Sequence, residues 1–291
     1  MHRTGTAGSP LASCARRFSG EENLIRNPTM LLVQSNQSID FLKKHNLGIE
    51  LATNKEEGRI DLEAYAPFVK TVHLPFSDAN GFLNLGAFDD AWRQESIECI
   101  KKAIDMSVRY NVTKAVLHPC CFLEKEHKEV GEYSRMIDAL RDIIDYAAKA
   151  KLVICLENQV LRHPDIRVIV GTSAAEWRQL PIDLGKSNVS LCLDTSHASS
   201  VAAMEETVEK RLQVLWDFFK EPDNITHFHW SDAKVLNGEA KYQDMHLVPG
   251  TGDLPLEFHQ TIAKHPGTKL LEQRSTEEAC TAGLAFIASL Q

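Results

Sequence analysis

The chain has 291 residues, of which 43% are hydrophobic and 25% are charged, a composition typical of a globular protein rather than a disordered one. Its formal net charge of −8 gives no general attraction to nucleic acid or to an anionic membrane. No apolar stretch approaches the roughly 20 residues that a membrane-spanning helix needs, so we expect no membrane partner.

Residues 1–28 are expected to form a disordered or targeting tail outside the folded domain. The first 20 residues contain three Arg and no acidic residue, the composition of an organellar transit peptide; a disordered tail or an over-extended start is the alternative. The seven Cys lack the spacing of a disulfide framework, which favours a reducing compartment. We therefore expect a cytoplasmic protein, with import into an organelle as the alternative.

From residue 29 onward, short apolar runs that predict strands alternate with segments of helical periodicity. The predicted strands cover residues 30–34, 48–52, 71–76, 114–119, 152–158, 189–194, 225–230 and 269–273. The clearest predicted helices cover residues 88–111, 132–151 and 203–220. Eight β-α units in a chain of this length predict an α/β protein with a single (β/α)8 TIM barrel over residues 29–291. A doubly wound open sheet is the alternative, but the glycine-rich loop that usually follows its first strand is missing.

Imidazole and carboxylate side chains stand where the apolar runs end. They are His73, His118, Glu157, Asp194, His197, His229 and Glu272, and the loop residues Asp244 and His246 join them. Such groups are costly to bury unless they are paired or bind a metal. Because the active sites of TIM barrels lie at the carboxyl ends of the strands, the pattern predicts a metal-dependent enzyme.

Four of these residues are expected to share one metal ion: Glu157, Asp194, His229 and Glu272, from the fifth to the eighth strand. Histidine and carboxylate ligands without thiolate suit Zn²⁺, Mn²⁺, Co²⁺ or Mg²⁺. A set of unrelated buried hydrogen bonds is the alternative. The remaining five residues either bind further metal or contact the substrate.

Some residues near the predicted site have two interpretations. Glu50, near the end of the second strand, is either a substrate contact or a buried ion-pair partner. Lys234 either binds an anionic part of the substrate or is solvated. The segment PGTGD at residues 249–253 is either a turn that its glycines permit or a backbone anion site. Cys120 and Cys121 form either a reactive pair or a structural loop.

The remaining histidines are given smaller roles. His227 precedes His229 by two residues and therefore shares its side of the strand, so we expect it to be a core group or a support for the ligand. No catalytic part is expected for His45, His163, His259 and His265.

Several motifs resemble those of the xylose isomerase-like TIM-barrel superfamily, which includes endonuclease IV (AP endonuclease family 2) and many sugar or sugar-phosphate isomerases and epimerases. The most specific motif is SLCLDTSH at residues 190–197. HWSDAK at 229–234, DMHLVPGTG at 244–252, HPCC at 118–121 and LEN at 156–158 resemble others. The resemblance covers residues 29–290 and implies the barrel fold.

The resemblance also implies roles for the residues. Glu157, Asp194, His229 and Glu272 match the metal site that the superfamily shares. In the isomerase branch, Glu157 and Glu272 would also act as an acid/base pair and His197 would contact the substrate. In the endonuclease branch, a second metal would bind His73 and His118 with Glu157 as the bridge. A third would bind His197, Asp244 and His246.

The sequence departs from the endonuclease pattern in three places. The first strand, MLLVQSN, lacks the Gly-x-His-x-Ser-like opening of endonuclease IV, and the His-x-Pro-Tyr motif is HLPF here, with Phe76 as the aromatic residue. The loop at residues 77–90 contains three Asp and no basic residue, and this loop and the altered first strand count against the endonuclease branch. An acidic loop is a poor lining for a DNA groove.

The favoured function is therefore a divalent-metal-dependent isomerase or epimerase that binds one ion and a small sugar or sugar phosphate. The alternative is a zinc-dependent phosphodiesterase of the AP endonuclease kind, with up to three zinc ions and DNA as its partner. In either case the chain could assemble as a homo-oligomer.

Overall fold

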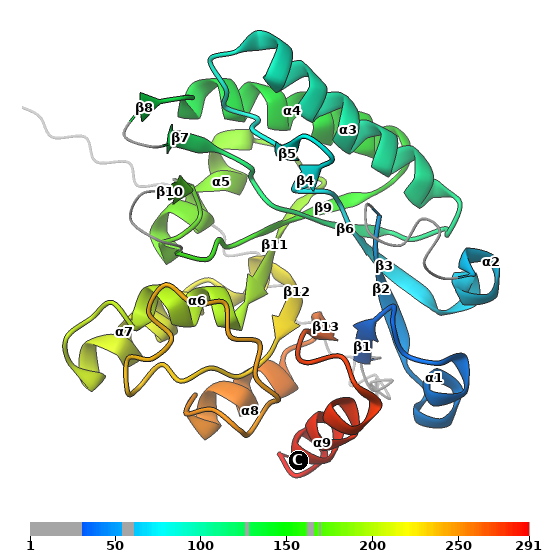
Figure 1. Cartoon of the computed structure of the whole chain (residues 1–291), viewed down its shortest axis with the longest axis vertical. Coiled ribbons are helices and arrows are strands. Elements are labelled where there is room, and N and C mark those ends of the chain that lie inside the picture. Colours follow the sequence, from blue (N-terminus) through cyan, green and yellow to red (C-terminus); the bar gives the residue numbers. More distant parts are fainter. Residues whose placement is uncertain (1–30, 54–60, 126–127, 162–165, 169, 291) are drawn as a thin grey trace, which may run out of the picture.

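Eight parallel strands close into a barrel in the order β1-β13-β12-β11-β9-β6-β3-β2 (Figure 1). The computed structural model describes residues 31–53, 61–125, 128–161, 166–168 and 170–290. The barrel strands are β1 Leu31–Gln34, β2 Gly48–Ala52, β3 Val69–His73, β6 Lys114–Leu117, β9 Val153–Glu157, β11 Val189–Asp194, β12 Ile225–Trp230 and β13 Thr268–Leu271. The predicted single (β/α)8 barrel is thereby confirmed. The predicted tail at residues 1–28 and His163 lie outside the described residues.

Helices surround the barrel, and α3 and α4 pack side by side along one flank (Figure 1). The helices are α1 Ile39–His45, α2 Leu62–Tyr65, α3 Asp90–Val108, α4 Tyr133–Lys149, α5 Ala174–Leu184, α6 Thr195–Ala202, α7 Val208–Asp217, α8 Leu256–Lys264 and α9 Glu277–Ala288. Short 3-10 turns η1 Ala66–Phe68 and η2 Pro222–Asn224 precede β3 and β12. In the described part of the chain, no helix has both the length and the apolar character that crossing a bilayer requires.

The structure corrects some element boundaries. The predicted helix over residues 203–220 begins only at Val208, because the Thr207 side chain accepts the Lys210 backbone N–H and caps it there. The third and fourth strands end earlier than predicted, at His73 and Leu117. Prolines follow each end by two residues and cannot donate to a strand ladder.

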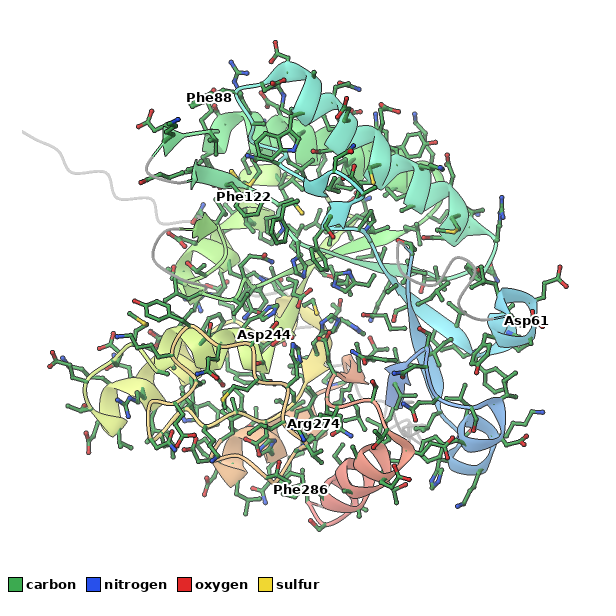
Figure 2. The ribbon with its side chains drawn as sticks, viewed as in Figure 1. Asp61, Phe88, Phe122, Asp244, Arg274 and Phe286 are labelled. Carbon is green, nitrogen blue, oxygen red and sulfur yellow. The ribbon has the colours of Figure 1, made fainter. Side chains whose placement is uncertain are left out.

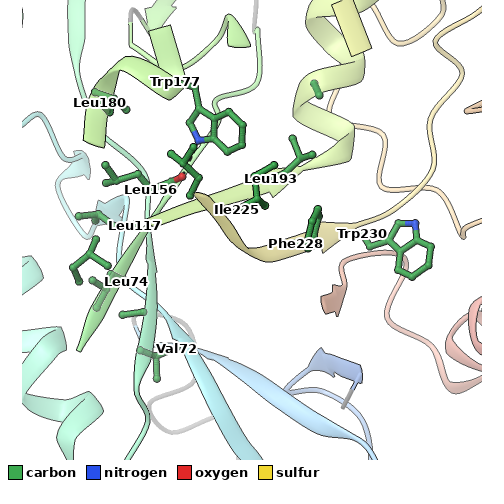
Figure 3. Close-up of a cluster of buried hydrophobic side chains, with 14 of the residues drawn as sticks. Val72, Leu74, Leu117, Leu156, Trp177, Leu180, Leu193, Ile225, Phe228 and Trp230 are labelled. Carbon is green, nitrogen blue, oxygen red and sulfur yellow. Dashed lines mark hydrogen bonds between the residues drawn. The ribbon is translucent and has the colours of Figure 1, made fainter. Parts of the chain in front are cut away.

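The main core fills the layer between strands and helices (Figure 3). Trp177 of α5 is fully buried, and its indole N–H donates to the Leu156 carbonyl of β9 at 2.8 Å. Its ring also packs against Phe218, with 5.7 Å between the ring centroids. This contact holds α5 on the strand that ends in Glu157 and so fixes the position of that strand end.

Loops after three barrel strands join to form a wall at the carboxyl ends. The β3–α3 loop contains a hairpin of β4 Ser77–Asp78 and β5 Gly81–Phe82. A separate sheet has the order β10-β7-β8, with β7 Phe122–Lys125, β8 Lys128–Glu129 and β10 Ile166–Val168. Asn84, which is fully buried, links the first two loops because its amide donates to the Phe122 carbonyl at 3.0 Å.

Lys269 of β13 carries a buried amine near the amino ends of the strands. The residue is 3% exposed, and its Nζ donates to the carbonyls of His265 and Gly267 at 2.6 and 2.8 Å. Burial, together with the nearby charge of Lys114, lowers the pKa of Lys269 to about 8.

This shift predicts a pH-dependent difference between the wild-type chain and a Lys269→Met variant. Between pH 8 and the ordinary lysine pKa of about 10.4, the unfolded chain binds more protons than the folded one. The free energy of unfolding of the wild-type chain, relative to that of Lys269→Met, should therefore rise by about 3 kcal/mol from the lower to the upper end of this pH window. Urea unfolding of both proteins at several pH values measures the difference. Parallel pH profiles would contradict it.

Candidate metal centre

Four neighbouring strands bring the four predicted primary ligands to one point. Glu157 and Asp194 are the last residues of β9 and β11, and His229 lies opposite Asp194 in the register of β11 and β12. Glu272 directly follows β13, where its N–H donates to the Trp230 carbonyl at 3.2 Å. One potential ligand atom from each of the four residues lies within 4.8 Å of the others.

The imidazole of His229 lies at the middle of this group. Its Nδ1 atom lies 2.7 Å from Glu272 Oε2, 3.1 Å from Glu157 Oε1 and 3.8 Å from Asp194 Oδ2. The side chains of Glu157, Asp194 and His229 are at most 1% exposed, whereas that of Glu272 is 20% exposed. The site therefore has a closed floor and opens beside Glu272.

A divalent cation fits the chemistry of this donor set. Asp194 Oδ2 is fully buried and has no hydrogen-bond partner among the described residues. Burial raises the pKa of Asp194 to about 7, even though His197 and His246 act to lower it. A buried carboxylate oxygen without a donor is costly, and one imidazole with three carboxylates is a suitable set for Zn²⁺ or Mn²⁺.

Glu157 also contacts two further histidines through its second carboxylate oxygen. Its Oε2 atom lies 2.9 Å from His118 Nε2 and 3.2 Å from His73 Nε2, while its Oε1 atom faces His229. Burial opposes ionisation of Glu157, but His229 and His118 outweigh it and hold its pKa well below the usual value. The carboxylate is thus placed as a bridge between two adjacent groups of ligands.

A third group lies on the other side of Asp194. His197 is in the first turn of α6, and its backbone N–H donates to Asp194 Oδ1 at 2.7 Å. Asp244, on the loop between β12 and α8 (Figure 2), lies 2.7 Å from His246 Nε2 and 3.6 Å from His197 Nε2. Ser196 accepts the His246 N–H at 3.3 Å and holds this loop on α6. The structure therefore brings all nine predicted ligands into one continuous cluster.

Glu50 lies beneath the cluster, inside the barrel, and is 4% exposed. Its oxygens each lie 2.9 Å from a histidine, Oε1 from His229 Nε2 and Oε2 from His227 Nε2. Thr71 Oγ1 donates to the same Oε2 atom at 2.6 Å, and His227 Nδ1 lies 2.6 Å from Thr268 Oγ1. Of the two interpretations of Glu50, these contacts favour the buried ion-pair partner over the substrate contact.

Glu50 is positioned to set the orientation of His229, since it contacts the ring nitrogen opposite the one that faces the ligands. We expect Glu50→Gln to weaken metal binding by about 10- to 100-fold, because supports of metal-binding histidines have effects of this size. Competition with a chelator measures the affinity. Lys269→Met, which removes a buried charge elsewhere in the barrel, is the matched control. Equal affinities in both variants and the wild-type chain would contradict the role.

Lys234 and the segment 249–253 each contact an acidic residue of the chain. Lys234 is 45% exposed at its side chain and pairs with Glu239 at 3.4 Å. The N–H groups of Gly250 and Leu254 donate to the carboxylate of Asp232 at 2.9 and 3.2 Å. A Cβ atom on Gly252 would lie 2.3 Å from Asp232 Oδ1, so glycine is required for this close approach. The anion that this turn binds is the chain's own Asp232.

The partner of Asp232 is a histidine that the sequence did not single out. His259 Nε2 lies 3.3 Å from Asp232 Oδ2, and the Trp230 indole donates to His259 Nδ1 at 2.9 Å. The other two described histidines with no expected catalytic part, His45 and His265, lie at the end of α1 and just after α8. The sequence does place Asp232 three residues after the predicted ligand His229, which could have marked it as a buried acid. Its partner His259 lies 27 residues further along the chain, so the pair could not be recognised from the sequence.

Cys120 and Cys121 belong to the packed loop after β6. Both thiols are buried, and burial raises the pKa of Cys121 to about 12 and that of Cys120 still further. The Cys120 carbonyl accepts the Leu85 N–H at 2.7 Å. These contacts favour the structural interpretation over a reactive pair, because the reactive form of cysteine is the thiolate.

Comparison with known proteins gives one matching family and two curated relatives. The family described as xylose isomerase-like TIM barrel matches residues 39–290. The relatives are the uncharacterized proteins MJ1311 and MJ1614 of Methanocaldococcus jannaschii, which are 28% and 24% identical over 214 and 225 residues. These matches cover 72% and 74% of this chain, and 65% and 74% of the relatives.

Solved structures share the fold at lower identity. The IolI protein with a bound zinc atom has a TM-score of 0.64 and 19% identity, covering 90% of this chain and 98% of its own. The TTHB071 protein from Thermus thermophilus, soaked with ZnCl2, has a TM-score of 0.61 and 17% identity, and the match covers 90% of this chain and 97% of that protein. A D-psicose 3-epimerase with D-tagatose from Clostridium cellulolyticum has a TM-score of 0.63 and 13% identity, and the match covers 90% of this chain and 99% of the epimerase.

Proposed function

Because this chain belongs to the family of xylose isomerase-like TIM barrels, we propose that it is a divalent-metal-dependent isomerase or epimerase of a sugar or sugar phosphate. Members of this superfamily are typically sugar isomerases and epimerases. The neighbouring structures include epimerases and zinc-bound proteins. The reacting part of the substrate would be a small polyol.

The observation that carries the proposal is the placement of two glutamates around one ligand nitrogen. Glu157 and Glu272 come from β9 and β13, at opposite ends of the arc β9-β11-β12-β13. Both carboxylates lie within 3.1 Å of His229 Nδ1. Two carboxylates on either side of a shared position can exchange a proton with neighbouring carbons, or with opposite faces of one carbon.

The chain's residues would divide the reaction as follows. When bound, the ion polarises substrate oxygens and stabilises the negative charge that develops on them. Glu272, at the open side of the site, removes the proton from carbon. Glu157, on the closed side, would deliver to carbon a proton that it first takes from a substrate hydroxyl, while Glu272 loses its own proton to solvent. The buried His197 would donate to another substrate hydroxyl. Glu50 keeps His229 in place throughout.

A second candidate, zinc-dependent phosphodiester hydrolysis with DNA as partner, is favoured by a separate observation. His73 and His118 face one oxygen of Glu157, and His246 with His197 faces Asp194, so the cluster offers ligands for up to three ions. Clustered ions suit hydrolysis of a phosphodiester. The net charge of −8 and the exposed aspartates of the 77–90 loop argue against a DNA partner.

Metal content and proton exchange separate the two candidates. The protein is purified without chelator or an affinity His tag, and its metal per chain is counted by elemental mass spectrometry. An isomerase or epimerase should hold about one exchangeable Mn²⁺, Co²⁺ or Mg²⁺ per chain and should incorporate deuterium from solvent into a ketose or ketose phosphate. Two to three tightly held zinc ions, cleavage of abasic-site DNA and no deuterium uptake would overturn it in favour of hydrolysis.

A further inference from the structure

We propose that Phe76, Phe82 and Phe122 form a stacking subsite beside the metal centre that binds a flat ring of the substrate. The inference rests on the proposed function, because it places this ring next to the oxygens that the metal centre would hold. It implies that the natural substrate carries a flat second ring, such as the aromatic group of an aryl glycoside or the base of a nucleoside, in addition to the reacting sugar.

The three rings form a continuous series that ends on a predicted metal ligand. Phe76 stacks on His118, with 4.9 Å between centroids and 14° between ring planes. Phe82 lies next to Phe76 at 6.4 Å and 27°, and next to Phe122 at 5.5 Å and 48°. Only the ring of Phe76 therefore separates Phe82 from the predicted ligand His118 in this series.

The subsite is held in place before any ligand arrives. The Leu83 N–H donates to the Phe76 carbonyl at 3.0 Å, and the Trp92 indole donates to the Phe82 carbonyl at 3.1 Å. Asn84 joins this loop to Phe122 by accepting its N–H at 3.3 Å and donating to its carbonyl at 3.0 Å. A preformed surface loses little conformational freedom when it binds a ligand.

The exposure of Phe82 indicates where the ligand ring lies. The residue is 47% exposed although its neighbours on either side are aromatic. Stacking on an aromatic side chain needs no hydrogen bond, because it uses the flat π-face that aromatic rings and nucleobases share.

The same loop provides a matched control. Phe88 is 41% exposed, but its ring lies 5.6 Å from the Arg135 guanidinium rather than in the series. Figure 2 shows Phe88 farther from the barrel than Phe122. Replacing Phe88 therefore removes an exposed phenylalanine from the same loop without touching the proposed subsite.

The test measures binding of three probes: phenyl glucoside, adenosine and free D-fructose. Saturation-transfer NMR identifies which ligand protons lie against the protein, and titration calorimetry gives the affinities, both with and without added Mn²⁺. The wild-type chain is expected to bind at least one ring-bearing probe more tightly than fructose, through its ring protons. Phe82→Ala should weaken that probe by about 5- to 100-fold, the range measured for stacking on aromatic side chains.

The controls make the outcomes distinct. Phe88→Ala should leave ring binding unchanged, and thermal unfolding should show that both variants fold. Equal losses in Phe82→Ala and Phe88→Ala, or tightest binding of fructose, would overturn the subsite. Preference for phenyl glucoside identifies a sugar-linked ring, and preference for adenosine identifies a base. Because binding is read without turnover, ring binding that Phe82→Ala abolishes, in a chain with no isomerase activity, would overturn the proposed function alone.

Discussion

Replacing Glu157 with glutamine is expected to release the bound metal and to lower turnover by about 10²- to 10⁴-fold, the range for loss of a proton-transferring group. The substitution keeps the size of the side chain but removes the negative charge that lies within 3.3 Å of His73, His118, His197 and His229. The amide NH2 would also point a donor at histidine nitrogens that need an acceptor. Metal content after dialysis and the rate of deuterium uptake measure the two effects.

A suitable control is another buried acid, Asp232, which is 1% exposed but contacts the 249–254 segment and His259 rather than the cluster. Asp232→Asn should lower the free energy of unfolding and leave metal bound at Glu157, Asp194, His229 and Glu272. If Glu157→Gln retained its full metal content and activity, the carboxylate would have neither of its proposed roles.

Replacing Glu272 with glutamine is expected to separate proton transfer from metal binding. Three ligands remain at the closed floor of the site, so the variant should still bind metal, although more weakly. Its amide cannot accept a proton from carbon, so deuterium uptake into the substrate should fall by about 10²- to 10⁴-fold. Both quantities are measured on the same metal-loaded preparation.

The exposed Glu277 at the start of α9 allows a control close in sequence. Its carboxylate accepts the Ser38 hydroxyl and is remote from the ligand set, so Glu277→Gln should change neither quantity. Unchanged exchange in Glu272→Gln would exclude this residue as the base, whereas a metal affinity equal to that of the wild-type chain would exclude it as a ligand.

The fold and the composition of the cluster could be predicted because both depend on local patterns. Each barrel strand is a short apolar run, and the parallel arrangement carries every strand end to the same face. The convergence of His73, His118, Glu157, Asp194 and His229 therefore required no knowledge of long-range contacts. The short helix that contains His197 was not predicted, although Asp194 caps this helix by accepting the His197 backbone N–H.

What the sequence could not provide were contacts between distant segments. Glu50 reaches two histidines more than 170 positions away, and only the closure of the barrel places β2 across from β12. Phe82 stacks between residues of two separate loops, so its neighbours depend on how Asn84 joins them. Side-chain pairs of this kind have no periodic signature, because tertiary packing decides them.

The enclosed carboxylate of Asp232 affects the heat-capacity change that should accompany metal binding. The loop that carries Asp244 and His246 is closed by backbone pairing of Asp232 with Leu247 and by the N–H groups that Asp232 accepts. Its order is maintained by an anion of the chain itself, which is present whether or not a metal is bound. Loading of the site should therefore bury little additional apolar surface and show only a small change in heat capacity, unlike metal-coupled folding.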